Sequence, residues 1–224
     1  MLLINSLLSL IYREYKINSH NFYDILSIIL FFFLGILIFV FSVGPEQEIF
    51  NKINIGIVWT LLLFSNNLTI NKFYQNDFED NSITLIHMSG LSFEIIVVIK
   101  LLTMWIFFQL PFILIIPISG VLLNIDFNKI NLIVLTFLIG SPILTTITSI
   151  SASMNLLNKK NFTLGSLIIM IFSIPVIIFS VGIFDVNQEM AKAQINILLG
   201  ILFLFIAITP WISAACIKLA IQNK

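Results

Sequence analysis

Three carboxylates lie close together in a chain that is otherwise mainly hydrophobic. Asp77, Glu79 and Asp80 are three of its eleven acidic residues, and Phe78 stands among them. No serine–histidine–carboxylate or cysteine–histidine set accompanies them, so the chemistry that they suggest is recognition rather than catalysis. An acidic, turn-rich segment between two hydrophobic spans predicts a surface on which a soluble partner can act.

The residues after these acids predict a short helix. Ser82 can accept a backbone N–H as its cap, and the preceding acids suit the positive end of a helix. Such a helix would present Ile83 and Ile86 to a molecule outside the bilayer. The predicted contact segment is 72–92, with contact residues Asp77, Phe78, Glu79, Asp80, Ser82, Ile83 and Ile86. A solvated loop whose charges keep it out of lipid is an equal alternative on these grounds.

Residues for other chemistry are sparse. The 224 residues contain no P-loop pattern, so hydrolysis of ATP would require a separate ATPase subunit. His20, His87, Met190 and Cys216 are isolated from one another in the sequence. We therefore predict that the chain is not an enzyme and that it binds no metal or cofactor of its own.

Hydroxyl side chains gather in one hydrophobic stretch, 130–156. Polar groups in lipid should face a helix interface or a polar cavity. Thr145, Thr148 and Ser149 are the candidate residues of a transport pathway. Hydrogen bonding between helices, or back to the helix that carries them, is the favoured alternative.

Lys100 is the basic residue of a hydrophobic span. A lysine at the centre of a bilayer costs about 2.5–3.5 kcal/mol on insertion scales. Because Lys100 lies about two turns from the expected helix start near Phe93, its stem could reach the interface. We expect Lys100 to snorkel in this way.

Composition defines the class to which these elements belong. Hydrophobic residues make up 59% of the chain and charged residues 10%, and the mean hydropathy is +1.09. The formal net charge is zero, which gives no basic footprint for nucleic acid. The chain is predicted to be an all-α polytopic integral membrane protein with one transmembrane domain over 1–224.

A helix needs about 20 apolar residues to cross the hydrocarbon core. Six segments meet this length, and Pro111 and Pro142 should kink or break the third and fourth, which makes them candidate hinges. The six predicted spans are 25–43, 53–71, 93–123, 130–156, 162–184 and 195–217.

The distribution of lysine and arginine predicts the orientation. With the N-terminus inside, eight basic residues lie near the cytoplasmic side and three outside, so both termini and the acidic segment are expected in the cytoplasm. Residues 1–24 carry Arg13 and Lys16 after the apolar run 7–11, unlike a secretory signal. They predict an amphipathic helix in the inner interface.

Four short sequence patterns then identify a family. Phe41-Ser42-Val43-Gly44-Pro45-Glu46 closes the first span, residues 76–83 form the acidic segment, Lys100, Trp105 and Leu110-Pro111 lie in the third span, and Gly140-Ser141-Pro142 lies in the fourth. In this order they resemble the CcmB family, the haem exporter protein B of cytochrome c maturation. Asn81 stands where that family usually has glycine, and asparagine also tolerates a left-handed backbone.

This resemblance implies an ABC-2-type permease in the inner membrane of bacteria or mitochondria. It implies a CcmA-like ATPase, CcmC-like and CcmD-like membrane subunits and a CcmE-like haem carrier as partners, and a homodimer of the permease. ATP would act through the ATPase, with haem as the candidate substrate. The acidic segment would couple ATP hydrolysis to haem export or to release of the loaded carrier.

Two other functions fit the same residues. A general ABC-2-type exporter of a lipid, polysaccharide or drug would have the same topology and acidic segment, without cytochrome defects on its loss. A scaffold that recruits partners in the membrane would work without nucleotide turnover. Neither the substrate nor the stoichiometry follows from the sequence.

Overall fold

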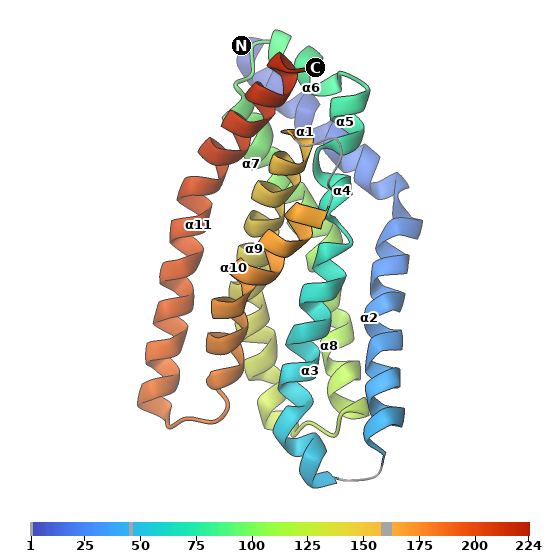
Figure 1. Ribbon diagram of the computed structural model, residues 1–224, viewed down its shortest axis with the longest axis vertical. Helices are drawn as coiled ribbons and strands as arrows, with labels where there is room; N and C mark the ends of the chain where they lie inside the picture. The colour runs from blue at the N-terminus through green and yellow to red at the C-terminus, as the bar shows by residue number, and fades with distance from the viewer. Residues whose placement is uncertain (1, 45–46, 158–162) are drawn as a thin grey trace.

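The protein is a bundle of helices that lie side by side along one long axis (Figure 1). The computed structural model describes residues 2–44, 47–157 and 163–224, and within these ranges the regular elements are helices without strands. Both ends of the chain lie at the same end of the bundle, where the short helices α5 and α6 also lie (Figure 1). The predicted all-α class is confirmed.

The chain runs up and down the bundle and is interrupted by short elements at that end. The elements in order are α1 (Leu2–His20), α2 (Phe22–Val43), α3 (Gln47–Asn67), α4 (Ile70–Phe73), α5 (Gln75–Glu79), α6 (Ser82–Met88), α7 (Phe93–Met104), the π-helix η1 (Trp105–Gln109), α8 (Phe112–Leu122), α9 (Phe127–Leu157), α10 (Thr163–Gly182) and α11 (Gln188–Gln222).

Helix length and composition support a multi-pass membrane protein. Among the described residues, five stretches are long and apolar enough to cross a bilayer: Phe22–Val43, Phe93–Leu122, Lys129–Leu157, Leu164–Gly182 and Gln188–Gln222. The predicted span 53–71 forms most of α3, which runs beside these helices in Figure 1 but is not among the five. Five of the six predicted spans therefore meet this criterion.

Helix α9 is the centre of the bundle. In an 18-residue hydrophobic stretch of α9, 61% of the residues are buried, against 17% in the corresponding stretches of α2 and α11. Gly140 of α9 packs directly against the fully buried Trp59 of α3, where an added Cβ would collide with the indole ring. Small residues let helices approach closely in membranes, and this explains why a hydroxyl-rich stretch occupies the core.

The two candidate hinge prolines differ in what they do to their helices. Leu110 and Pro111 form a turn between η1 and α8, so the predicted third span is interrupted there. The Leu110 N–H bonds to the Trp105 carbonyl oxygen at 3.1 Å, the wider spacing of a π-helix. Pro142 lies inside α9, which continues through it. Of the two, Pro111 marks a helix break.

Candidate functional site

The three acids of the acidic segment differ in exposure: one is largely buried and two are exposed. The Asp77 side chain is 13% exposed, whereas Glu79 and Asp80 are exposed. Successive helical residues are about 100° apart around the axis, so Asp77 and Glu79, two residues apart on α5, lie on nearly opposite faces. The segment therefore has an inward face at Asp77 and an outward face at Glu79 and Asp80.

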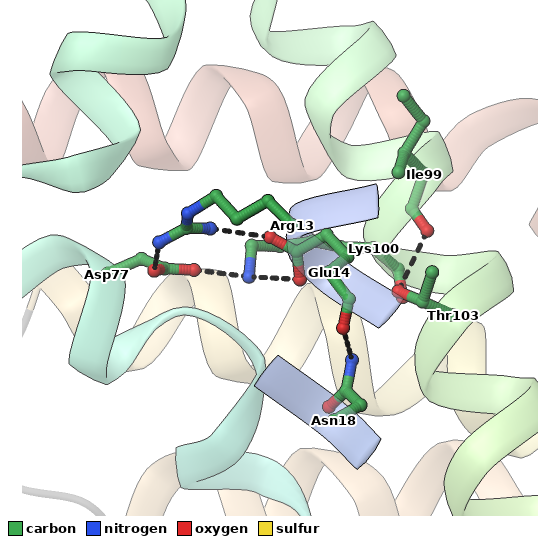
Figure 2. Close-up of polar contacts among 7 residues, drawn as sticks. All are labelled: Arg13, Glu14, Asn18, Asp77, Ile99, Lys100 and Thr103. Atoms are coloured by element: carbon green, nitrogen blue, oxygen red, sulfur yellow. Dashed lines mark hydrogen bonds and ion pairs between the residues drawn. The ribbon is translucent and has the colours of Figure 1, made fainter. Parts of the chain in front are cut away.

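On the inward face, four charged side chains from three elements form one cluster (Figure 2). Lys100 of α7 pairs with Asp77 of α5 and, at 3.2 Å, with Glu14 of α1. Arg13 of α1 donates to the second Asp77 oxygen at 2.5 Å and to Glu14 at 2.7 Å. Two cations and two anions alternate around this charged cluster, so its formal charges cancel.

Burial makes these pairings necessary. The Lys100 side chain is 5% exposed and that of Glu14 is 2% exposed, while Arg13 at 30% lies on the outer rim. A buried charge is tolerated when it is paired and hydrogen-bonded. The snorkelling predicted for Lys100 is wrong, because its ammonium group ends between two carboxylates inside the protein.

The charges of the cluster also shift the pKa values of Asp77 and Arg13. Burial alone would raise the pKa of Asp77, but the nearby Lys100 charge and the Arg13 hydrogen bond outweigh it and lower that pKa. Burial opposes the charge of Arg13, yet its bonds to Asp77 and Glu14 raise its pKa. Because the Asp77 pKa is depressed in the folded state, its contribution to stability is present at neutral pH and is lost as pH falls through that value.

Helix α1 is fixed to α7 by more than the charges. Leu10 packs against Leu91, Ile96 and Ile99, one turn before Glu14. Within their own helices, Asn18 donates to the Glu14 carbonyl oxygen at 3.0 Å and Thr103 bonds to the backbone of Ile99 and Lys100 (Figure 2). The helix predicted for the N-terminal residues is present.

The inward face of α1 carries polar as well as apolar side chains. Glu14 and Asn18 follow Leu10 at intervals of four and face inward with it, whereas Leu8 is 60% and Tyr12 67% exposed on the outside. The sequence did hold a signal for Glu14: it is the only acid among the first 20 residues, and a lysine within a span requires a partner.

At the start of α6, the helix begins one residue earlier than a cap at Ser82 would allow. Asn81 is the N-cap residue, with φ of +59°, and Ser82 is already helical, so the capping role predicted for Ser82 is wrong. The left-handed backbone at Asn81 agrees with the family's usual glycine. Lys224 holds this turn by donating to the Phe78 carbonyl oxygen and to Asn81 Oδ1, each at 2.6 Å.

The side chains that α6 presents also differ from those predicted. Ile83 is 1% exposed and belongs to the core, and Ile86 is half-buried, so neither offers its side chain freely to a partner. Leu85 and Met88 are 65% and 77% exposed instead. With Glu79 and Asp80 they make up what we call the outward face, the exposed acids and large apolar side chains of the α5–α6 segment.

Inside the bundle, neutral side chains form a second polar region. Asn66 of α3 donates to Thr148 of α9 at 2.5 Å and accepts from Gln109 of η1. Ser149 of α9 bonds to the Tyr74 hydroxyl at 2.7 Å and to Ser213 of α11 at 3.2 Å. These six side chains, which we call the polar seam, connect α3, the α4–α5 junction, η1, α9 and α11.

The three candidate pathway residues lie in different surroundings. Thr148 and Ser149 are fully buried in the polar seam. Thr145 bonds to the Ser141 carbonyl oxygen of its own helix at 2.9 Å and lines a cavity of about 270 Å³ with Trp105, Pro142 and Pro210. A transport pathway along these three residues stays a prediction. The alternative, hydrogen bonding to another helix or back to α9 itself, is present for each of them.

The side chain of His87, which could bind iron, is engaged with its neighbours in the fold. His87 stacks on Phe93 at 4.0 Å, and its Nδ1 lies 2.8 Å from the Leu91 carbonyl oxygen. The described residues contain no group of three His, Cys, Asp or Glu side chains that could hold a metal. The charged cluster pairs its carboxylates with cations, and its arrangement suits holding helices together.

Fold and site together define a multi-pass, all-helical membrane protein with an acidic segment at the end where both termini lie. A family described as CcmB protein matches residues 5–220, and the chain belongs to the CcmB family. This agrees with the resemblance carried by the four sequence patterns.

Several relatives match almost the full chain. The chain is 28% identical to "Heme exporter protein B" of Haemophilus influenzae over 218 residues, which cover 96% of this chain and 99% of that protein. It is 29% identical to the protein of the same name from Bradyrhizobium diazoefficiens, with 96% and 98% coverage. A "Putative cytochrome c biogenesis ccmB-like mitochondrial protein" of Marchantia polymorpha is 27% identical, with 91% and 70% coverage.

Proposed function

We propose that this chain is the membrane permease subunit of an ABC-type haem exporter of cytochrome c biogenesis. In this role it couples ATP hydrolysis by a separate ATPase to haem export or to release of a haem-loaded carrier. Membership of the CcmB family and the names of its relatives support this function. The single structural observation that carries the coupling role is the outward face, whose exposed side chains belong to the α5–α6 segment at the end of the bundle where both termini lie (Figure 1).

The partners follow from the family. A CcmA-like ATPase contacts the outward face, two copies of the permease pair with two ATPases, and CcmC-like, CcmD-like and CcmE-like proteins complete the pathway. The distribution of basic residues supports cytoplasmic termini, which places the outward face where ATP is available. Relatives occur in bacteria and as a mitochondrial protein, so the same arrangement applies to either inner membrane.

Loss of the protein tests the function itself. Depletion should abolish haem-stained c-type cytochromes, because haem no longer reaches the apoproteins. A carrier that still holds haem would indicate a release role, and an empty carrier would indicate haem supply. Unchanged cytochromes would exclude the proposed function and favour a general ABC-2-type exporter.

Substitution of the outward face tests the coupling surface. Leu85→Gln with Met88→Gln removes exposed apolar area without touching the core, so the chain should accumulate normally. We expect the CcmA-like ATPase to be lost from the purified complex, because burial of apolar surface is a main driving force of protein–protein association. Leu219→Gln, a leucine 49% exposed on α11, is the matched control. Equal recovery of the ATPase with the unmodified chain, the double variant and the control would contradict the assignment of this surface to the ATPase.

A further inference from the structure

The acidic segment is joined to the bundle by two kinds of contact. One is covalent and neutral: α4 continues from α3, and the Tyr74 hydroxyl bonds to Ser149 of α9. The other is ionic: Asp77 reaches across to Lys100 of α7 and Arg13 of α1. Figure 2 shows that these ionic contacts come from elements far apart in the sequence.

Stability alone does not account for an ionic contact at this place. Well-packed apolar side chains of similar volume often match or exceed the stability of a buried ion pair. What charge pairs add is a fixed partner and direction, since each cation must keep its anion when the elements move. Lys100 bonds to Glu14 and Asp77 at once, and Arg13 does the same from the rim, so α5 cannot shift without acting on both α1 and α7.

Helix α7 leads from the charged cluster to the interior. Five residues after Lys100 it becomes the π-helix η1, and the helix breaks at Pro111. Within η1, Gln109 donates to Asn66 of the polar seam, and Trp105 donates to Ser141 of α9 at 3.0 Å. A π-helix within a longer helix frequently marks a functional site. The charged cluster and the polar seam thus share one element, α7 with η1.

We propose that Arg13, Glu14 and Lys100 are positioning residues that tie Asp77 to α1 and α7, so that force applied at the outward face reaches η1 and the centre of the bundle. This inference rests on the proposed coupling of ATP hydrolysis to haem handling. It assigns α1 a part in transmission besides its place at the membrane interface. The outward acids and Asp77 then have separate tasks: the first meet the partner, and the second passes its movement inward.

Charge-balanced double variants test the tie while avoiding an unpaired buried charge. Arg13→Gln with Asp77→Asn detaches the segment and leaves the Glu14–Lys100 pair. Glu14→Gln with Lys100→Met leaves the Arg13–Asp77 pair. The measurement is haem delivered to the carrier per ATP hydrolysed, at equal amounts of assembled complex in membranes. We expect this ratio to fall about 2- to 30-fold in both variants, the range of measured couplings, while ATPase recovery stays unchanged.

Two further variants separate positioning from a structural role. Lys100→Arg keeps the positive charge and supplies a guanidinium whose N–H groups can donate to two carboxylates, so it should retain most of the ratio. Asp24→Asn with Lys72→Met removes another charge-balanced pair, which joins α2 to α4 at 2.8 Å with both side chains 35% exposed. That control should keep the normal ratio.

The possible outcomes each decide the inference. An unchanged haem-to-ATP ratio in Arg13→Gln with Asp77→Asn would overturn it, even if the more buried Glu14 and Lys100 variant fails to accumulate. Loss of the assembled complex in Arg13→Gln with Asp77→Asn would also overturn the inference, because the charged cluster would then serve folding. Failure of the proposed function is separate, since it would appear as normal cytochromes after depletion of the unmodified chain.

Discussion

The charged cluster and the polar seam satisfy buried polar groups in two different ways. In the charged cluster every partner comes from another residue's side chain, and three separate elements supply the four charges. In the polar seam, hydroxyls such as that of Thr148 bond to a neighbouring helix and also to the Leu144 carbonyl oxygen of their own helix at 2.8 Å. The Thr148 hydroxyl thus keeps a local partner when its neighbour moves, whereas Lys100 and Asp77 are paired only with residues of other elements.

This difference assigns the two regions different mechanical properties. A buried charge that loses its partner is costly, so the charged cluster should move as a unit or stay in place. A neutral interhelical hydrogen bond in a membrane protein averages only about 0.6 kcal/mol, so the seam can exchange partners cheaply. The structure therefore joins a stiff tie at the end of the bundle to an adaptable centre.

The largest expected effect comes from removing one charge alone. Lys100→Met leaves Glu14 and Asp77 with Arg13 as their remaining cation, and we expect about 3–5 kcal/mol of lost stability, as when one partner of a buried pair is removed. Adding Glu14→Gln restores the balance of charge and should recover most of it. Thermal unfolding of the purified chain in detergent would measure both.

The half-exposed Lys72 supplies the control for that comparison. Lys72→Met breaks its pair with Asp24 and should change stability by less than about 1 kcal/mol, because exposed ion pairs contribute little. If Lys100→Met proved as stable as its double variant, the view of the cluster as a unit that must stay charge-balanced would be wrong.

The sequence predicted the helices and the place of the acidic segment because both depend on local composition. Runs of about 20 apolar residues form helices wherever they occur in a bilayer, and five of the six predicted spans form helices both long and apolar enough to cross one. Pro111 was predictable as a break from its missing N–H. The π-helix at Trp105–Gln109 was not predicted.

The site was harder to predict because its partners come from distant parts of the chain. Asp77 and Glu79 look equivalent in sequence, and only the docking of α5 against α1 and α7 turns one inward and the other outward. Ile83 looked like a contact residue, yet tertiary packing buries it and exposes Leu85. The strongest signal in the sequence was Lys100, because a lysine within a hydrophobic span requires an acidic partner from another part of the chain.

A smaller effect is expected within the polar seam, and it tests the adaptable half of the comparison. Asn66→Leu removes the acceptor of Gln109 and a donor to Thr148, so we expect about 1–2 kcal/mol of lost stability, measured by thermal unfolding in detergent. Thr145→Val is the matched control on α9, because its hydroxyl bonds to Ser141 of the same helix and its shape is kept. It should cost less than about 0.5 kcal/mol, within the range of substitutions that break no interhelical contact. A loss with Asn66→Leu as large as that with Lys100→Met would mean that the seam is as stiff as the charged cluster, and force would then pass through the bundle without any exchange of partners at its centre.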